Sequence, residues 1–221
     1  MLVDVNSTLF AYAITRDFGF APNPFNGICT LATCKPGIRK SAEVGDWVMG
    51  IGGSSLKPVK RKCICLMRVS EKLGFQEYWD DDRFLNKRPS RNGSRVQMLG
   101  DNIYHKDEQN QWVQEDSHHS NPDGSPNLEN LERDTGRTNQ VLVSNYFFYF
   151  GRQAITVDLE SMNYKRIRNF KKIKLSESIE AKNIITSIIN QNKRNSNLVV
   201  SDPCQFMDSH QRVDQGSGKI V

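Results

Sequence analysis

Apolar side chains occur along this chain in short runs separated by turn residues, a pattern typical of β-strands. Residues 9–15 (LFAYAIT) form the first run and predict a strand that ends before a loop rich in proline and glycine. Residues 47–52 (WVMGIG) follow a Gly-Asp turn, and residues 63–69 (CICLMRV) are largely apolar on both alternating faces. We expect these two runs to pair as a hairpin whose second strand is covered on both sides.

Other strands are expected before and after that hairpin. Residues 28–36 (ICTLATCKP) favour a short strand that Pro36 stops, with a helical turn as the alternative. Residues 141–143, 146–150 and 154–157 are apolar or aromatic runs beyond the middle of the chain. Strands are therefore expected both in the first 70 residues and in the middle of the sequence.

One helix is predicted near the end of the chain. Isoleucines recur at helical spacing over residues 177–193, with Ser176 or Ser178 as the N-cap. Residues 100–138 are instead rich in Gly, Pro, Asn and Asp, and predict long polar loops that are functional or disordered. The predicted fold class is α+β: a curved, mostly antiparallel sheet or β-barrel with long polar loops and one C-terminal amphipathic helix.

Composition narrows the class of protein. The 221 residues fit one large domain, and a hydrophobic fraction of 37% is lean but sufficient for a core. No run of about 18 apolar residues occurs, so no membrane span is expected. The five cysteines are odd in number, and the first segment reads as a strand rather than an export signal, which indicates reduced thiols and a cytoplasmic protein. The net charge of +5 permits nucleic-acid binding without proving it.

The spacing of Cys63 and Cys65 does not match that of a zinc knuckle. Cys63 and Cys65 alternate with apolar residues in a strand-like run, whereas paired zinc thiolates usually have two residues between them. We interpret both as buried core cysteines.

The hairpin segments GDWVMGIGG and CICLMRVSE carry a local resemblance. They resemble the core hairpin of PUA-like barrels, the group that includes the EVE, ASCH and YTH domains. This resemblance implies a barrel that cradles a nucleic-acid base, often a modified one.

A wider resemblance covers roughly residues 8–155. It is carried by the succession FAPNPFNGICTLATCKPGIRK, GDWVMGIGG, EYWDDDRF, GDNIYH, DSHHS, NLENLERDT and VLVSNYFFYFG. This succession is similar to the second of the nucleotide modification associated domain families. The resemblance implies that the protein acts together with systems that modify, read or restrict modified bases in phage and bacterial DNA. It does not identify any active-site motif with an assigned role.

That resemblance sets the expected domain organisation. We assign residues 1–158 to a nucleotide-modification-associated, PUA-like domain and residues 159–195 to a basic segment with the amphipathic helix packed on it. Residues 196–221 are assigned to a C-terminal tail.

Three of the four histidines gather with several aspartates in residues 100–124 (GDNIYHKDEQNQWVQEDSHHSNPDG). His118 and His119 are adjacent, so an extended chain would point them to opposite faces, and one metal would rarely bind both. The well-marked zinc spacings are absent, and we assign no metal and no cofactor. A metal site, a polar ligand or acid/base site, and a loop scaffold all stay open. If the protein is an enzyme, its catalytic candidates are His105, His118 and Asp101.

The segment EYWDDDRF at 77–84 has two interpretations. It is either a solvated turn anchored by its aromatics or an aromatic wall for a flipped base, with a magnesium site as a further alternative. The wall requires Trp79 and His105 to lie close together around a common hollow. The candidate ligand-binding residues are Trp47, Tyr78, Trp79, Asp80, Asp82, Arg83, Phe84, Asn102, Tyr104, Ser117 and His119.

Lysines and arginines form three runs, which fit either a solvated surface or contacts with phosphates. The candidates for nucleic-acid backbone contacts are Lys60, Arg61, Arg88, Arg91, Lys171 and Lys172.

The leading functional hypothesis is recognition or processing of a modified nucleobase, nucleotide or DNA in a bacterial or phage modification or defence system. Nucleic acid or a nucleotide is the expected partner, together with proteins of the modification system. One alternative is a nucleotide- or base-directed hydrolase or transferase with a His/Asp acid-base site, and another is a structural accessory subunit. The sequence does not separate these three.

Overall fold

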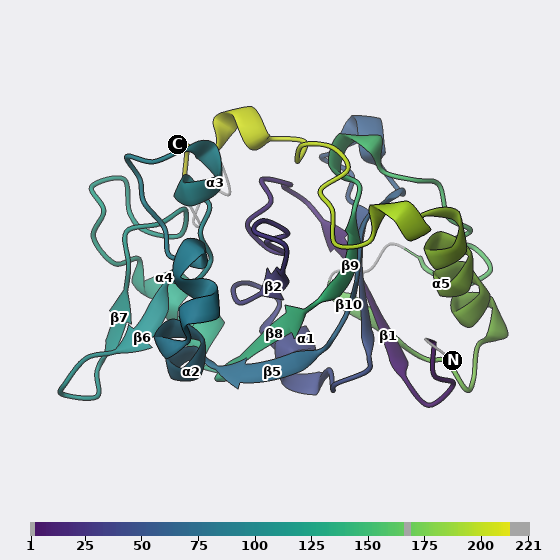
Figure 1. Ribbon diagram of the computed structural model, residues 1–221, viewed down its shortest axis with the longest axis horizontal. Coiled ribbons are helices and arrows are strands. Elements are labelled where there is room, and N and C mark those ends of the chain that lie inside the picture. The colour runs from purple at the N-terminus through teal and green to yellow at the C-terminus, as the bar shows by residue number, and fades with distance from the viewer. Residues whose placement is uncertain (1–2, 166–168, 213–221) are drawn as a thin grey trace.

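Figure 1 shows the computed structural model, which describes residues 3–165 and 169–212. Its largest sheet is mixed, because β1 and β3 run parallel while the other neighbours pair antiparallel. In spatial order its strands are β10 (Phe170–Lys174), β1 (Thr8–Ile14), β3 (Trp47–Gly52), β4 (Cys63–Arg68) and β9 (Tyr146–Tyr149). The expected hairpin is confirmed as β3 and β4.

Two smaller sheets extend the structure. The first is antiparallel and comprises β2 (Cys29–Leu31), β8 (Gln140–Ser144) and β5 (Glu71–Gly74). The second is a hairpin of β6 (Tyr104–Lys106) and β7 (Trp112–Gln114). Because β8 passes directly into β9, the first small sheet is joined to the large one by a single residue of connection.

Short helices connect these sheets. The α-helices are α1 (Pro36–Ser41), α2 (Phe75–Asp80), α3 (Arg95–Met98), α4 (Leu128–Thr135) and α5 (Ile179–Gln191). The 3-10 helices are η1 (Lys57–Val59), η2 (Asp82–Lys87), η3 (Gly151–Gln153), η4 (Lys193–Asn195) and η5 (Phe206–Asp208). Figure 1 shows α2, α3 and α4 with the β6–β7 hairpin at one end of the molecule and α5 at the other.

The core occupies both faces of the large sheet. On one face, Ile185 and Ile188 of α5 pack with Trp47 and Phe148. The predicted amphipathic helix is therefore confirmed, and Ser178 caps it by accepting a hydrogen bond from the Ala181 amide at 3.2 Å. The opposite face buries a second cluster, which includes Phe10, Tyr12, Cys65 and Phe147. Cys63 and Cys65 are 0% and 1% exposed, as expected of core thiols.

The α+β class and the mostly antiparallel pairing are confirmed, but the strands that the structure describes form an open sheet rather than a closed barrel. Hydrogen bonds at the outer edge of β9 give a physical reason why the sheet does not close. The Asn197 amide donates to the Phe147 carbonyl at 2.8 Å, and the Val200 amide donates to the Tyr149 carbonyl at 2.8 Å. The C-terminal segment thus occupies backbone groups of β9 that a closing strand would need.

Two sequence-based expectations about individual segments differ from the structure, the first because it was incomplete and the second because it was wrong. The stretch 100–138 is not only loop, because it contains β6, β7 and α4. Residues 154–157 contribute a single bridge between Ile155 and Cys63 instead of a strand. Tertiary contacts act in both places, since the Lys106 amide of β6 donates to Gln76 Oε1 of α2 at 2.8 Å and Ile155 pairs with Cys63, and the periodicity of a single segment does not capture such contacts.

No helix within residues 3–165 and 169–212 is long and apolar enough to cross a membrane.

Candidate active site

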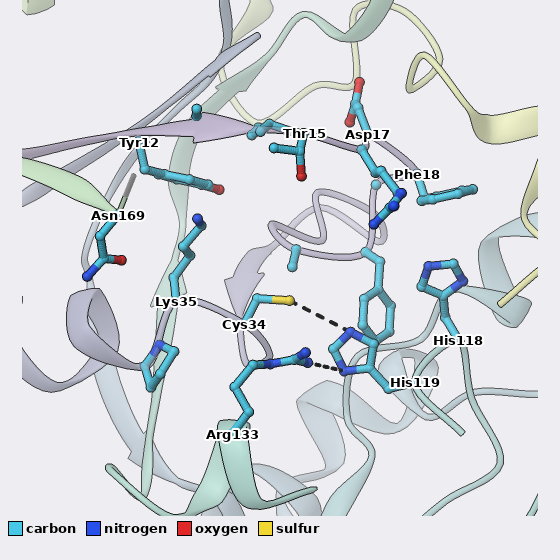
Figure 2. A pocket seen from close by; sticks show the side chains of 17 residues that line it. Tyr12, Thr15, Asp17, Phe18, Cys34, Lys35, His118, His119, Arg133 and Asn169 are labelled. Atoms are coloured by element: carbon cyan, nitrogen blue, oxygen red, sulfur yellow. Dashed lines mark hydrogen bonds between the residues drawn. The ribbon is translucent and has the colours of Figure 1, made fainter. Parts of the chain in front are cut away.

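A cavity of about 350 Å³ opens where β1, the loop that follows it, the β2–α1 turn and the end of α4 meet (Figure 2). Its size lies in the range of small-molecule sites. Its lining is both aromatic and charged. The residues that line it and carry rings or polar groups include Tyr12, Thr15, Arg16, Asp17, Phe18, Phe20, Cys34, Lys35, His118, His119, Arg133 and Asn169.

Cys34 is presented by a strained turn between β2 and α1. Its φ is 56°, and the next residue, Lys35, has φ 41° and ψ 47°. Two successive non-glycine residues in the left-handed region cost about 1–3 kcal/mol each, and Pro36 restricts Lys35 further. Tertiary hydrogen bonds hold the turn: the Cys34 amide donates to Asp134 Oδ1 at 2.8 Å, and its carbonyl accepts from Arg39 Nε at 2.9 Å. A strand–turn–helix that exposes a side chain in a strained backbone is how hydrolase folds present a nucleophile.

His119 connects Cys34 to a buried carboxylate. Its Nε2 lies 3.7 Å from Cys34 Sγ, and its Nδ1 lies 3.0 Å from Asp134 Oδ2. Arg133 also approaches Nδ1, at 3.4 Å, but a guanidinium only donates. We assign the Nδ1 proton to the shorter contact with Asp134, which leaves Nε2 facing the thiol.

Asp134 is fully buried and is held by several donors. Its Oδ2 accepts from the Tyr104 hydroxyl at 3.0 Å, and its Oδ1 accepts from Arg133 Nε at 3.2 Å. Arg39, also buried, donates to the Asp134 carbonyl at 2.6 Å and to the Gln140 carbonyl at 2.7 Å. The carboxylate is thereby fixed in position relative to the imidazole, as the orienting member of a catalytic triad must be.

The electrostatic surroundings shift the pKa of Cys34 toward the thiolate and the pKa of His119 toward the imidazolium. Burial raises the pKa of the Cys34 thiol, but the charge and hydrogen bond of His119 more than offset this, so the pKa lies below its usual value. Burial lowers the pKa of His119, but Cys34 and Asp134 more than reverse it, so the net shift is upward. Burial alone would raise the pKa of Asp134, yet its hydrogen bond to His119 and the nearby cations hold that pKa well below the ordinary value. A lowered pKa increases the fraction of thiolate, which is the nucleophilic form of a cysteine.

His118 lines the same cavity in a neutral form. Burial, with the charge of His119, lowers the pKa of His118 to about 3. Its Nδ1 lies 2.8 Å from the Gln211 carbonyl, which can only accept, so Nε2 carries the lone pair. The two imidazoles do not point to opposite faces, because residues 117–120 form a turn closed by the Ser120 amide and the Ser117 carbonyl at 3.1 Å.

Comparison with models of protein families identifies the family of this chain. The model of the nucleotide modification associated domain 2 family matches residues 6–210. The chain belongs to this family. No curated protein and no solved structure matches it. Membership associates this domain with nucleotide or DNA modification systems, and the match extends through α5. The division of this domain at residue 158 stays a prediction, as do the PUA-like relationship and the cytoplasmic location.

Trp79 and His105 of this nucleotide modification associated domain lie together, but outside the cavity. Their rings stack with centroids 4.0 Å apart at 16°, and Arg88 Cζ lies 3.9 Å from the centre of the Trp79 ring. His105 Nε2 also contacts Glu115 Oε1 at 2.7 Å. The two side chains touch directly, with no hollow between them, and Trp79 already has two partners for its ring.

Other predicted residues of the family domain are buried in polar networks or in the core. Asp101 accepts from Thr30 Oγ1 at 2.7 Å and from the Tyr78 hydroxyl at 2.8 Å. Asn102 Nδ2 donates to the Tyr78 carbonyl at 2.9 Å. Phe84 and Trp47 are 0% exposed. These side chains stabilise the fold around the cavity and do not line it.

The remaining candidates are dispersed. Ser117 Oγ accepts from the His119 amide at 3.2 Å and so supports the histidine turn. The exposed Asp80 contacts Gln76, Asp82 is exposed, and Arg83 pairs with Glu71 and Asp81. The predicted phosphate contacts lie outside the cavity lining, at Lys60, Arg61, Arg88, Arg91, Lys171 and Lys172. Of all the predicted site residues, the cavity brings together only His118 and His119.

Sequence reasoning missed Cys34 and Asp134. The available signal was a cysteine at the end of an apolar run, directly before a Lys-Pro-Gly that starts a helix. Asp134 lies 100 residues from Cys34, so only tertiary structure brings them together. In the part of the chain that the structure describes, no group of three or more His, Cys, Asp and Glu side chains is arranged to hold a metal ion.

Proposed function

We propose that this protein is an enzyme of a nucleotide- or DNA-modification system that processes a nucleotide or nucleobase through a cysteine nucleophile. One observation carries the proposal: Cys34 and His119 line a cavity large enough for such a substrate, and the buried Asp134 lies behind His119, in a continuous chain of contacts at 3.7 and 3.0 Å. Among the three functions that the sequence left open, this geometry favours the hydrolase or transferase.

The reaction assigned to the site has two balanced steps. The Cys34 thiolate attacks an electrophilic sp² carbon of the substrate, an S–C bond forms, and the leaving group departs with the proton of the His119 imidazolium. Water, or a second nucleophile in a transferase, then attacks the same carbon. His119 takes its proton, the S–C bond breaks, and the thiolate–imidazolium pair is restored.

Recognition without turnover would use the same cavity, but it gives no reason for the strained cysteine turn. The neutral His118 fits either role, because its Nε2 lone pair can accept a hydrogen bond from a base amine. The predicted protein partners and the predicted phosphate contacts of the basic runs stay predictions.

Alkylation with iodoacetamide, followed by mass spectrometry, tests the nucleophile. We expect Cys34 to react well below pH ~8.5, where an ordinary thiol is mostly protonated. Cys204 is a matched control within the same chain: it is also partly exposed, but burial and the nearby Asp17 raise its pKa to about 12. Reaction of Cys34 no faster than Cys204, or with the pH profile of an ordinary thiol, contradicts the proposal.

Turnover is tested separately. Wild type and Cys34→Ser are incubated with deoxynucleotides and with DNA carrying modified bases, and products are identified by mass spectrometry. We expect product with the wild type alone, and for the serine variant a binding affinity close to that of the wild type. Equal product from both proteins would refute a thiol mechanism.

A further inference from the structure

A tyrosine hydroxyl in the cavity wall has no partner. Tyr12, on β1, is 1% exposed, and its hydroxyl makes no hydrogen bond with the described residues. Figure 2 shows the Lys35 side chain extending toward the Tyr12 ring. Buried hydroxyls are nearly always paired, so an unpaired one on a cavity wall indicates a ligand atom that completes its bonding.

Lys35 supplies a cation at the same place. Its Nζ lies 5.2 Å from the centre of the Tyr12 ring, and no hydrogen bond or ion pair joins it to an acceptor within residues 3–165 and 169–212. The residue is half-buried, and its left-handed backbone is fixed by the same turn that presents Cys34. A lysine held in this way without a counter-ion is suited to bind an anion.

The charges that face this cation leave the cavity positive. Arg16 and Arg133 line it together with Lys35. The acidic residue in the lining, Asp17, is already used by the Tyr149 hydroxyl and by the Cys204 amide at 2.9 Å. Arg133 is paired with Asp134 and the Cys34 thiolate with His119, so within residues 3–165 and 169–212 Arg16 and Lys35 are the lining cations without an ion pair.

A second hollow adjoins the cavity beside α1. It is lined by Pro36, Gly37, Lys40, Gly136, Arg137 and Asn169, and it shares Pro36 and Asn169 with the cavity. Lys40 and Arg137 are exposed there, so positive charge continues outward from Lys35. A phosphate at Lys35 would therefore be at the end of the cavity from which a nucleic-acid strand could leave.

We infer that the Lys35 ammonium and the Tyr12 hydroxyl form an anion subsite beside Cys34 that binds a phosphate group of the substrate. This inference rests on the proposed function and specifies its substrate class: a phosphorylated nucleotide, free or within a strand, rather than a nucleobase or nucleoside. Lys35 supplies charge, Tyr12 donates one hydrogen bond, and the reacting carbon lies toward Cys34 and His119.

Two alkylating agents test the subsite without a known substrate. Iodoacetate is anionic and iodoacetamide is neutral, so the ratio of their rates at Cys34 measures local attraction for an anion, and iodoacetamide corrects for any change in the thiol itself. We expect Lys35→Met to lower the iodoacetate/iodoacetamide ratio by about fivefold or more, because one nearby charge is removed. Tyr12→Phe should lower it by about twofold. Lys57→Met, an exposed lysine outside the cavity, is the control and should leave the ratio unchanged.

Protection experiments distinguish the sources of the phosphate. Inorganic phosphate, the four deoxynucleoside 5′-monophosphates, the corresponding deoxynucleosides and a 12-residue single-stranded oligonucleotide are each tested for slowing the iodoacetamide reaction. We expect the monophosphates to protect at concentrations at least about tenfold below those of the deoxynucleosides, a difference that Lys35→Met removes. Stronger protection by the oligonucleotide than by the monophosphates assigns the phosphate to a strand, and the reverse order assigns it to a free nucleotide.

The outcomes separate this inference from the proposed function. A ratio unaffected by both Lys35→Met and Tyr12→Phe, with Cys34 still reactive at low pH, overturns the anion subsite and leaves the nucleophile intact. An unreactive Cys34 overturns the proposed function instead. Tyr12→Phe should fold as well as the wild type, since the Tyr12 hydroxyl forms no hydrogen bond with any residue that the structure describes.

Discussion

Two histidines of this protein are each paired with a carboxylate, yet their surroundings differ. His105 contacts Glu115 at 2.7 Å, and His119 contacts Asp134 at 3.0 Å. The side chain of Glu115 is 39% exposed, and the His105 ring lies against Trp79. Asp134 is 0% exposed, and the free nitrogen of His119 faces a thiol and a cavity.

The comparison shows that an imidazole–carboxylate pair is not itself an active site. At His105 the ring is used for packing between β6 and α2, so the pair stabilises a surface. At His119 the same pair is buried beside Cys34 on a cavity, and burial strengthens each electrostatic interaction. Whether such a pair can take part in a reaction depends on a third group beside the imidazole, here the Cys34 thiol, and on an adjoining cavity.

The largest expected difference between the two regions is in stability. Asp134→Asn should lower the free energy of unfolding by about 3–5 kcal/mol, because it leaves Arg39, Arg133 and His119 without a buried counter-charge. Glu115→Gln should cost only about 0–1 kcal/mol, because its ion pair is solvated. Denaturant unfolding of both variants checks this, and equal losses would contradict the contrast.

The pH dependence of unfolding refines that result. The pKa of Asp134 is depressed in the folded state, so its contribution is complete above the unfolded pKa of about 3.9 and is lost as the pH falls below it. Wild type should therefore lose more stability than Asp134→Asn between about pH 4 and pH 2. If the free energy of unfolding fell equally in the two proteins over this pH range, the Asp134 carboxylate would not be a strongly paired anion.

The two histidines should also differ in how strongly they affect the reactivity of Cys34. His119→Gln should slow iodoacetamide labelling of Cys34 at pH 6.5 by about tenfold or more, because the thiol reverts toward an ordinary pKa. His105→Gln should change the rate by less than about twofold, because its ring does not reach the cavity. A similar loss in both variants would mean that the two regions are coupled.

The smallest expected effect concerns Trp79. Trp79→Ala should cost about 1–3 kcal/mol of stability through the lost contacts with His105 and Arg88. It should leave Cys34 labelling, and nucleotide protection of Cys34, within about twofold of the wild type. Weaker nucleotide protection in this variant would restore Trp79 as a ligand-binding residue.

Local sequence patterns were sufficient for several elements. The β3–β4 hairpin follows from alternation around a glycine turn, and α5 follows from isoleucine spacing and the Ser178 cap, because both depend on contacts close in sequence. The crowding of His118 and His119 also drew attention to a segment that lines the cavity. The β10 strand escaped prediction because its partner β1 is distant in the sequence, and the β6–β7 hairpin escaped it because its strands have only three residues each and lack a clear apolar alternation.

By itself, then, the sequence determined the α+β class, the family and one stretch of the site. Tertiary structure alone decided that the sheet stays open and that His119 rather than His105 faces a cavity. It also decided that Cys34 and Asp134, 100 residues apart, lie within one hydrogen bond of each other. The physical reason is that a catalytic geometry is made by long-range closure: strands, a helix end and a turn must pack before the thiol, imidazole and carboxylate meet, and no local periodicity encodes that meeting.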